Sequence, residues 1–169
     1  MQRHHAIISG TGRAGTTFLV QLLTHLGLDT GFTKNDLPIN SNARAGLELD
    51  VREDGAPYIV KNPWFCDYAE DVIQNPNIII DHVFIPMRDI YQATESRKHV
   101  IKTGLADASW TKRLSYKLGL TSIHGGLWHT RDEKKQQEIL LRQLYNLMLA
   151  LSKEDVPATL LQYPCLLYT

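Results

Sequence analysis

Residues 10–17 read Gly-Thr-Gly-Arg-Ala-Gly-Thr-Thr and have the spacing of a phosphate-binding loop. A short apolar run, residues 6–9, precedes them and a helix-like stretch follows them, as such a loop requires. Both glycines and the final hydroxyl of the pattern G-x-x-x-x-G-K-S/T are present, but Thr16 replaces its lysine. The nearest cation is Arg13, inside the loop. Backbone N–H groups and a helix N-terminus can still hold an anion, so we expect this segment to bind a phosphate-like group.

A second candidate anion site consists of Arg88 and Ser96, which are eight residues apart. Arg88 follows an apolar run, and Ser96 lies two turns into the helix that we expect after it. A guanidinium at the end of a strand can hold a phosphate through two parallel hydrogen bonds, and a helix serine can add a hydroxyl. Taken alone, Arg88 is more simply interpreted as a surface arginine paired with Asp89 or Glu95. Its combination with the loop at residues 10–17 is what favours a ligand.

The loop and the Arg…Ser pair together resemble the sulfotransferase family, whose members transfer a sulfuryl group from 3′-phosphoadenylyl sulfate (PAPS). In that family a loop ending in G-T-T binds the 5′-phosphosulfate, and an Arg…Ser pair with this spacing binds the 3′-phosphate. The resemblance extends from the first expected strand to the last and is closest to the bacterial type, although many members have lysine where Arg13 stands. It implies PAPS as donor, adenosine 3′,5′-bisphosphate as product and no required metal. It also implies that the cofactor-binding residues are Gly12, Arg13, Ala14, Gly15, Thr16, Thr17, Arg88 and Ser96.

The same resemblance implies catalytic roles for Arg13, Lys61 and Glu48. Arg13 would neutralise the donor and polarise its bridging oxygen as the bisphosphate leaves. Lysines placed like Lys61 contact the transferred sulfonate in the family, and a solvated lysine before a turn is an equal alternative. The family uses a glutamate or a histidine as base, and Glu48 is preferred because similar Gly-x-Glu segments recur in bacterial relatives. Asp36 and His82 are the rivals, and His82 is better explained as structural because it sits inside an expected strand.

Several other side chains have both a functional and a structural interpretation. Either loop threonine could cap the following helix. His124 and His129 flank the sequence Gly-Gly-Leu-Trp, which could form a lid over an acceptor or an adenine. Aromatic residues are more often core than pocket-lining, and the four that could line an acceptor pocket are Trp64, Phe65, Tyr91 and Trp128.

The composition indicates an ordinary globular protein, which we interpret as a single domain spanning residues 1–169. Hydrophobic residues make up 43% and charged residues 21% of the 169 positions. Because 18 basic residues balance 18 acidic ones, we expect no general attraction to nucleic acid. The two cysteines, Cys66 and Cys165, lack metal-type spacing and indicate a reducing compartment. No apolar run is long enough for a membrane span and no signal peptide is evident, so we expect a cytoplasmic protein.

The expected elements alternate between strands and helices. The strands are predicted at residues 4–9, 57–61, 77–87 and 158–162, and the helices at 16–27, 64–74, 89–103 and 132–153. Residues 28–56 are turn-rich with a possible short helix at 42–49, and residues 104–131 are largely irregular with a short helix near 109–118. This alternation predicts an α/β, three-layer P-loop-like fold with a central parallel sheet and helices on both faces. The phosphate loop, Lys61 and Arg88 all follow strands, where ligands bind in such folds.

The leading hypothesis is therefore a sulfotransferase that acts on a hydroxyl or amine of a small-molecule, carbohydrate or lipid acceptor. One alternative is a small P-loop kinase with a degenerate Walker loop, and another is a nucleotide-binding domain without catalysis. The acceptor-choosing segments, residues 28–56 and 104–131, carry no decisive motif, and the oligomeric state is open. The chain stops on a short apolar stub. We expect the native chain to continue past Pro164.

Overall fold

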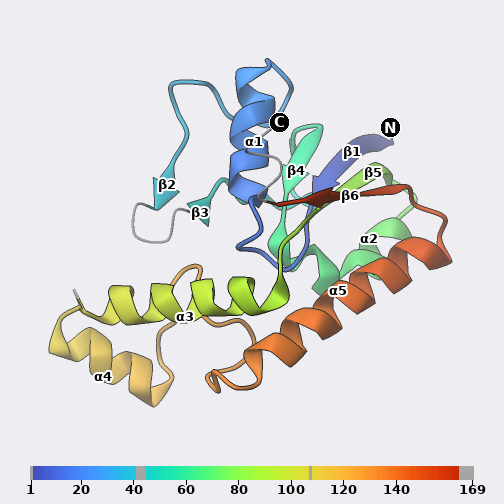
Figure 1. Ribbon diagram of the computed structural model, residues 1–169. Helices are drawn as coiled ribbons and strands as arrows, with labels where there is room; N and C mark the ends of the chain where they lie inside the picture. The colour runs from blue at the N-terminus through green and yellow to red at the C-terminus, as the bar shows by residue number, and fades with distance from the viewer. Residues whose placement is uncertain (1, 41–44, 107, 164–169) are drawn as a thin grey trace.

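The computed structural model describes residues 2–40, 45–106 and 108–163. Its main sheet consists of four parallel strands, β1 (Arg3–Ile8), β4 (Ile59–Lys61), β5 (Ile78–Met87) and β6 (Ala158–Gln162). Their order across the sheet is β4-β1-β5-β6 (Figure 1). Two short strands, β2 (Ile39–Asn40) and β3 (Ala45–Gly46), form a separate antiparallel pair. The position past which we expect the chain to continue, Pro164, lies outside the described residues.

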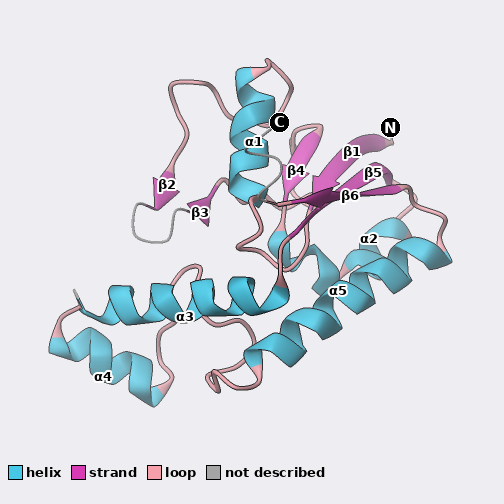
Figure 2. Cartoon of the chain, viewed as in Figure 1, coloured by secondary structure: helices cyan, strands magenta, loops and turns pink. Residues whose placement is uncertain are grey.

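Helices cover both faces of the main sheet, which confirms the expected three-layer α/β arrangement. Figure 2 shows α1 (Thr16–His25) on one face, and α2 (Ala69–Ile73) and α5 (Gln136–Lys153) on the other. A 3₁₀ helix, η1 (Pro63–Asp67), leads into α2. The remaining helices, α3 (Ile90–Ala106) and α4 (Trp110–Leu118), extend beyond the carboxyl end of β5. No helix in the described part of the chain is long and apolar enough to cross a membrane.

The core is built on the alternation of side chains along β1. Ile7 and Ile8 are both fully buried, and because neighbouring strand residues point to opposite faces they join different clusters. Ile7 packs with Phe65 and Leu147 beneath η1 and α5, whereas Ile8 packs with Val20 beneath α1. The sheet is therefore buried on both sides, as a parallel sheet requires.

The chain path places a ligand site at the carboxyl ends of β1 and β5. From β1 the chain passes through α1 to β4 on one side, and then crosses to β5 on the other side of β1. In open parallel sheets, ligands bind where the strand order reverses in this way. The loop after β1 and the residues after β5, beginning with Arg88, lie at this point.

Three expected helices differ from the structure. Residues 45–49 form no helix, because the positive φ angles of Gly46 (146°) and Leu47 (66°) are incompatible with one, and residues 41–44 lie outside the described chain. The expected helix at 64–74 is divided at Tyr68, whose φ and ψ of −145° and 18° separate η1 from α2. The expected helix at 132–153 begins only at Gln136.

Other boundaries agree with the sequence predictions. β6 covers the predicted residues 158–162, and Ser109 caps α4 by accepting a hydrogen bond from the Lys112 N–H. Asp89 caps α3, since its Oδ1 accepts from the Gln92 N–H over 2.8 Å. The cap fixes the direction in which α3 leaves β5, and with it the position of Ser96.

Candidate functional site

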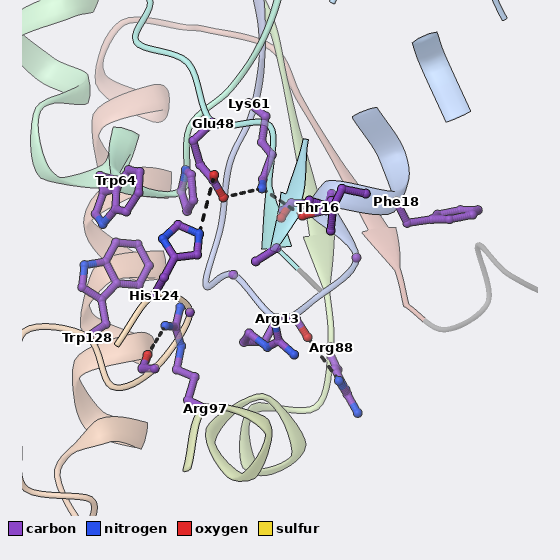
Figure 3. Close-up of a pocket in the computed structure, with 18 of the residues that line it drawn as sticks. Arg13, Thr16, Phe18, Glu48, Lys61, Trp64, Arg88, Arg97, His124 and Trp128 are labelled. Atoms are coloured by element: carbon purple, nitrogen blue, oxygen red, sulfur yellow. Dashed lines mark hydrogen bonds and ion pairs between the residues drawn. The ribbon is translucent and has the colours of Figure 1, made fainter. Parts of the chain in front are cut away.

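A pocket of about 840 Å³ opens at the carboxyl ends of the strands. Its walls come from the loop after β1, from Lys61 at the end of β4, and from Glu48 in the segment after β3. The segment 122–129, between α4 and α5, closes the remaining side. Figure 3 shows these groups converging on one space from elements that are distant in the sequence.

Backbone conformation and close packing require the glycines of the loop. Gly12 has a φ of +63°, and a Cβ there would lie 2.7 Å from Nη2 of Arg97. Gly15 has a φ of +89°, and a Cβ there would lie 2.5 Å from the ring of Tyr163. Arg13 also has a positive φ, 56°, which is uncommon for a residue with a side chain. The loop therefore holds its backbone in a conformation that few other sequences allow.

The start of α1 faces the pocket. Thr16 is the first helical residue, and the first bond of the helix runs from the Leu19 N–H to the carbonyl of Gly15. The N–H groups in the first turn of a helix have no acceptor within the helix, so a helix N-terminus can bind an anion. Neither threonine side chain caps the helix, because the N-cap position belongs to Gly15. Ala14 is fully buried and does not line the pocket.

Arg88 and Ser96 both contact the loop through Arg13. Arg13 Nε donates to Ser96 Oγ over 3.1 Å, and Arg88 Nη1 donates to the backbone carbonyl of Arg13 over 3.2 Å. Arg88 also donates to Oε1 of Gln92 and lines the pocket, whereas Ser96 lies outside the lining. The simpler interpretation of Arg88 was a surface arginine paired with Asp89 or Glu95. Neither carboxylate forms an ion pair with it, since Asp89 caps α3 and Glu95 pairs with Lys98. The structure thus brings the two sequence-derived anion sites into direct contact.

Lys61 is buried and connects three segments. Its Nζ donates to Thr17 Oγ1 over 2.9 Å, to the carbonyl of Gly46 over 2.6 Å and to Glu48 Oε1 over 2.7 Å. Only 2% of the residue is exposed, so the alternative of a solvated lysine is wrong. Burial lowers the pKa of Lys61, and the neighbouring Glu48 opposes that shift. All three ammonium protons have acceptors within the protein.

The three candidate bases occupy different environments. Glu48 lines the pocket, with Oε1 bonded to Lys61 and Oε2 lying 3.9 Å from Nε2 of His124. Asp36 is exposed in a turn with Thr33 and does not line the pocket. His82 lies within β5 and bonds Oγ1 of Thr159 on β6, so it is a structural residue of the sheet.

Two of the four candidate aromatic residues line the pocket. Trp64 and Trp128 meet edge to face with ring centroids 6.4 Å apart. Phe65, a residue of η1, is fully buried in the core, and Tyr91 is exposed on α3. Beside Trp128, the ring of His129 stacks on the indole and its Nε2 lies 3.0 Å from Asp67 Oδ2.

Arg97 is a site residue that the sequence reasoning missed. The side chain is only 6% exposed, yet it lines the pocket. Nη2 donates to the carbonyl of Thr11 over 2.6 Å and Nη1 to that of Gly126 over 2.7 Å, while buried Nε has no protein partner. Burial, and then the charge of Arg13, lower the pKa of the Arg97 guanidinium. The only signal in the sequence is that Arg97 directly follows Ser96.

The pocket carries a surplus of positive charge. Its described lining contains four Lys or Arg side chains and one carboxylate, which are Arg13, Lys61, Arg88, Arg97 and Glu48. That carboxylate is already paired with Lys61, and no described carboxylate oxygen lies within 4.0 Å of the guanidinium of Arg88 or Arg97. Because the whole chain has a formal net charge of +0, this surplus is a local feature that an anionic ligand would neutralise.

The described residues contain no group of three or more His, Cys, Asp and Glu side chains placed to hold a metal ion. In comparisons with protein-family models, with curated proteins and with solved structures, nothing matched this chain.

Proposed function

We propose that the protein is a sulfotransferase that moves a sulfuryl group from PAPS to a hydroxyl or amine of a small-molecule, carbohydrate or lipid acceptor. The observation that carries this proposal is the joining of two anion sites through Arg13. The glycine loop at the start of α1 and the Arg88–Ser96 pair suit a ligand with two separate anionic groups. PAPS has such groups, a 5′-phosphosulfate and a 3′-phosphate.

The charge of the residues present suits this donor. The unpartnered buried Nε of Arg97 and the local surplus of positive charge both favour an anion. Loop N–H groups and Arg13 would hold the phosphosulfate, and Arg88 would hold the 3′-phosphate with the hydroxyl of Ser96. Ser96 now bonds Arg13, so its hydroxyl would have to accept from Arg13 and donate to the phosphate.

The proposed reaction is an in-line substitution at sulfur. The acceptor oxygen forms a bond to sulfur as the bond from sulfur to the bridging phosphate oxygen breaks. The electron pair of the broken bond stays on adenosine 3′,5′-bisphosphate, where Arg13 and the loop N–H groups stabilise the added charge. Lys61 holds Thr17 and Glu48 in place, and so positions the start of α1 against the acceptor side of the pocket.

A kinase is less well supported. In a P-loop kinase the hydroxyl of the last Ser or Thr of the loop binds Mg²⁺, and Thr17 holds that position in this chain. Here that hydroxyl accepts a hydrogen bond from a buried ammonium group, Lys61 Nζ. A cation at this position opposes the binding of a second cation.

Calorimetric titration with adenosine 3′,5′-bisphosphate, and separately with ATP and Mg²⁺, tests the proposal. We expect metal-independent binding of the bisphosphate that Arg88→Ala weakens by about 10- to 100-fold, the cost of a charge-assisted hydrogen bond. Arg142→Ala is the matched control, because Arg142 is exposed on α5, lies outside the pocket lining and pairs with Glu138. A preference for ATP with Mg²⁺ would contradict the proposal. Bisphosphate binding without sulfuryl transfer from PAPS to any of a broad panel of acceptors would favour a non-catalytic nucleotide-binding domain.

A further inference from the structure

The helix α4 carries an exposed apolar stripe. Trp110 is 73% exposed, Leu114 46% and Leu118 65%, and because they recur every four residues they share one face of the helix. Leu120, just after the helix, is also exposed. None of the residues Trp110–Leu118, all of which the structure describes, is buried. Figure 1 shows α4 at an end of the molecule distant from the main sheet, so the stripe is not part of the core.

A row of basic side chains lies next to this stripe. Arg113 and Lys117 follow the first two members of the stripe by three residues, so they occupy the adjacent row of the helix. Lys112 is exposed on the same helix, and residues 108–122 contain no aspartate or glutamate. Because the whole chain has a formal net charge of +0, this cationic amphipathic helix is a local feature.

Arg113 also holds α4 against the end of α3. Its Nε donates to the carbonyl of Leu105 over 2.8 Å, and its Nη2 donates to that of Ala106 over 2.6 Å. These bonds satisfy two carbonyls at the end of α3, where the helix itself offers no donor. An arginine stays charged in proteins and its acceptors here are neutral, so the basic row keeps both of its positive charges.

The opposite side of α4 meets the segment before α5. The guanidinium of Arg131 lies 5.9 Å from the centre of the Tyr116 ring, and the charge of Glu133 also acts on Tyr116. Tyr116 is two residues after Leu114, about 200° around the helix, and therefore lies on the side away from the stripe. The one described carboxylate that acts on this helix thus does so behind the stripe.

We propose that α4 binds the protein reversibly to the surface of an anionic phospholipid bilayer, with the stripe among the upper acyl chains and the basic row against the headgroups. Lysine and arginine side chains can extend along an apolar surface to place their charges in water, and an indole suits this boundary because its ring is apolar and its N–H polar. Such a helix lies in the interface and does not cross the membrane. The inference is independent of the proposed function, because the described pocket lining contains no residue of α4.

Charge and size favour a bilayer over a second copy of the chain as the occupant of the stripe. A two-fold contact uses the same patch on both subunits, so Arg113 and Lys117 would lie close to their own copies. Like charges across an interface are unfavourable, whereas anionic headgroups attract both side chains. At 1.5 Å per residue the stripe is only about 12 Å long, whereas a stable dimer buries about 800 Å² on each subunit.

Binding through α4 would bring one wall of the pocket close to the lipid. Ser122 lines the pocket and follows the exposed Leu120 by two residues. Two residues of chain span at most about 7 Å. The pocket wall therefore begins within about 7 Å of the apolar surface that meets the bilayer.

The first test measures binding of the chain to sucrose-loaded vesicles by sedimentation. One set of vesicles is phosphatidylcholine alone, and in the other about a third of the lipid is phosphatidylserine. We expect the chain to bind the phosphatidylserine vesicles at least about tenfold more tightly, and added salt to weaken that binding. No binding to the phosphatidylserine vesicles, or equal binding to both sets, would overturn the proposal.

Two single substitutions separate the apolar stripe from the basic row. We expect Trp110→Ala and Lys117→Glu each to weaken binding to the phosphatidylserine vesicles by about tenfold. Tyr145→Ala and Lys34→Glu are the matched controls, because both side chains are exposed and neither is on α4. All four positions are exposed, so the changes leave the core intact. The proposal is wrong if the controls lose as much affinity as the α4 variants, or if the α4 variants lose none.

Tryptophan fluorescence locates the stripe in the bound state. The emission should shift to shorter wavelength on phosphatidylserine vesicles, because the exposed indole of Trp110 leaves water. Trp110→Phe keeps an apolar ring, so this variant should still bind but should lose most of the shift, although Trp64 and Trp128 remain. An undiminished shift in Trp110→Phe would show that another surface meets the lipid.

Analytical ultracentrifugation without lipid tests a second copy of the chain as the occupant. We expect the unchanged chain and Trp110→Ala to have the same mass in solution. A dimer that Trp110→Ala converts to a monomer would identify the stripe as an interface between copies and would overturn the proposal.

Discussion

Lys61 Nζ donates a hydrogen bond to Thr17 Oγ1, so the lysine that the loop lacks in sequence reaches it from the neighbouring strand β4. The parallel register explains this contact, since Lys61 pairs with Ile8, the last residue of β1 before the loop. The local sequence of the loop contains no lysine. The contact with Lys61 can be predicted only when the pairing of β1 with β4 is known.

Removal of this buried cation should destabilise the protein. Lys61→Met leaves the Glu48 carboxylate without its buried ammonium partner, and breaking a largely buried ion pair costs about 2–4 kcal/mol of unfolding free energy. Urea unfolding followed by circular dichroism measures the change. Lys153→Met is the control, because Lys153 and Glu70 form an exposed pair worth less than about 1 kcal/mol.

A double variant tests whether the cost comes from the pair itself. Lys61→Met combined with Glu48→Gln removes both charges, so the double variant should be more stable than the sum of the two single changes predicts. Strictly additive costs would show that Lys61 acts through Thr17 and Gly46 and not through Glu48.

The loop glycines should differ in their effect on anion binding. Gly12→Ala places a methyl group against the guanidinium of Arg97, which cannot easily move because it is hydrogen-bonded to two backbone carbonyls. We therefore expect affinity for the bisphosphate to fall more than about tenfold. Gly55→Ala is a matched control, since Gly55 also has a positive φ, +82°, but no atom lies within 4 Å of the added carbon. Both variants should lose about 1 kcal/mol of stability from backbone strain. Equal affinities in calorimetric titration would show that contact with Arg97 is irrelevant.

Local patterns predicted the strands and the loop. The apolar run that ends at Met87 and the Gly-rich residues 10–17 depend on side-chain alternation and backbone freedom within a few residues. Because parallel strands present their carboxyl ends along one edge, the approach of Arg88 to the loop also followed from the sequence. The contact of both Arg88 and Ser96 with Arg13 is the detail that this reasoning left open.

The remaining part of the site depends on irregular segments, which have no periodicity to interpret. Glu48 meets His124 only because the turn at Gly46 and Leu47 and the loop before α5 bring them together. Arg97 was missed for another reason. Burial of an arginine without a carboxylate is contrary to the usual preference for exposure, so sequence alone favours a surface position. The positions of Glu48, His124 and Arg97 therefore depend on how the loops connect the helices and strands, and not on local secondary-structure propensity.

Arg97 should be required in both charge and shape. Its two N–H groups hold the carbonyls of Thr11 and Gly126, so it connects the phosphate loop to the segment 122–129. A lysine keeps the charge but cannot reproduce the planar fork, and a glutamine loses the charge. We expect Arg97→Lys to weaken bisphosphate binding about 10-fold and Arg97→Gln about 100-fold in calorimetric titration.

The same substitutions at an exposed arginine show how much of any loss of bisphosphate affinity comes from changing an arginine anywhere in the protein. Arg142→Lys and Arg142→Gln on α5 should bind the bisphosphate like the unchanged protein, because Arg142 lies outside the pocket lining. If Arg97→Lys binds as tightly as Arg142→Lys, the fork geometry of Arg97 has no role in the site.

Cys66 should be unreactive in the folded protein. Burial, and then the neighbouring Asp67, raise the pKa of its thiol from 9.0 to about 12, so very little thiolate exists at pH 8. In a Cys165→Ser background, where Cys66 is the sole cysteine, we expect 5,5′-dithiobis(2-nitrobenzoate) to react about 100-fold or more slowly than with the urea-unfolded chain. Equal rates in the two states would contradict the partly buried environment of this thiol.

The same shift should make folding sensitive to alkaline pH. Because the folded pKa of Cys66 lies above the unfolded value, the unfolded chain loses the thiol proton first as the pH rises. The stabilising contribution is therefore complete below pH 9.0 and is lost progressively as the pH approaches about 12. Unfolding free energies of Cys165→Ser and of Cys165→Ser with Cys66→Ala, measured between pH 8 and 11, isolate this contribution because other titrating groups cancel. The alanine variant should lose less stability on alkalinisation, and parallel curves would show that the Cys66 thiol ionises equally in both states.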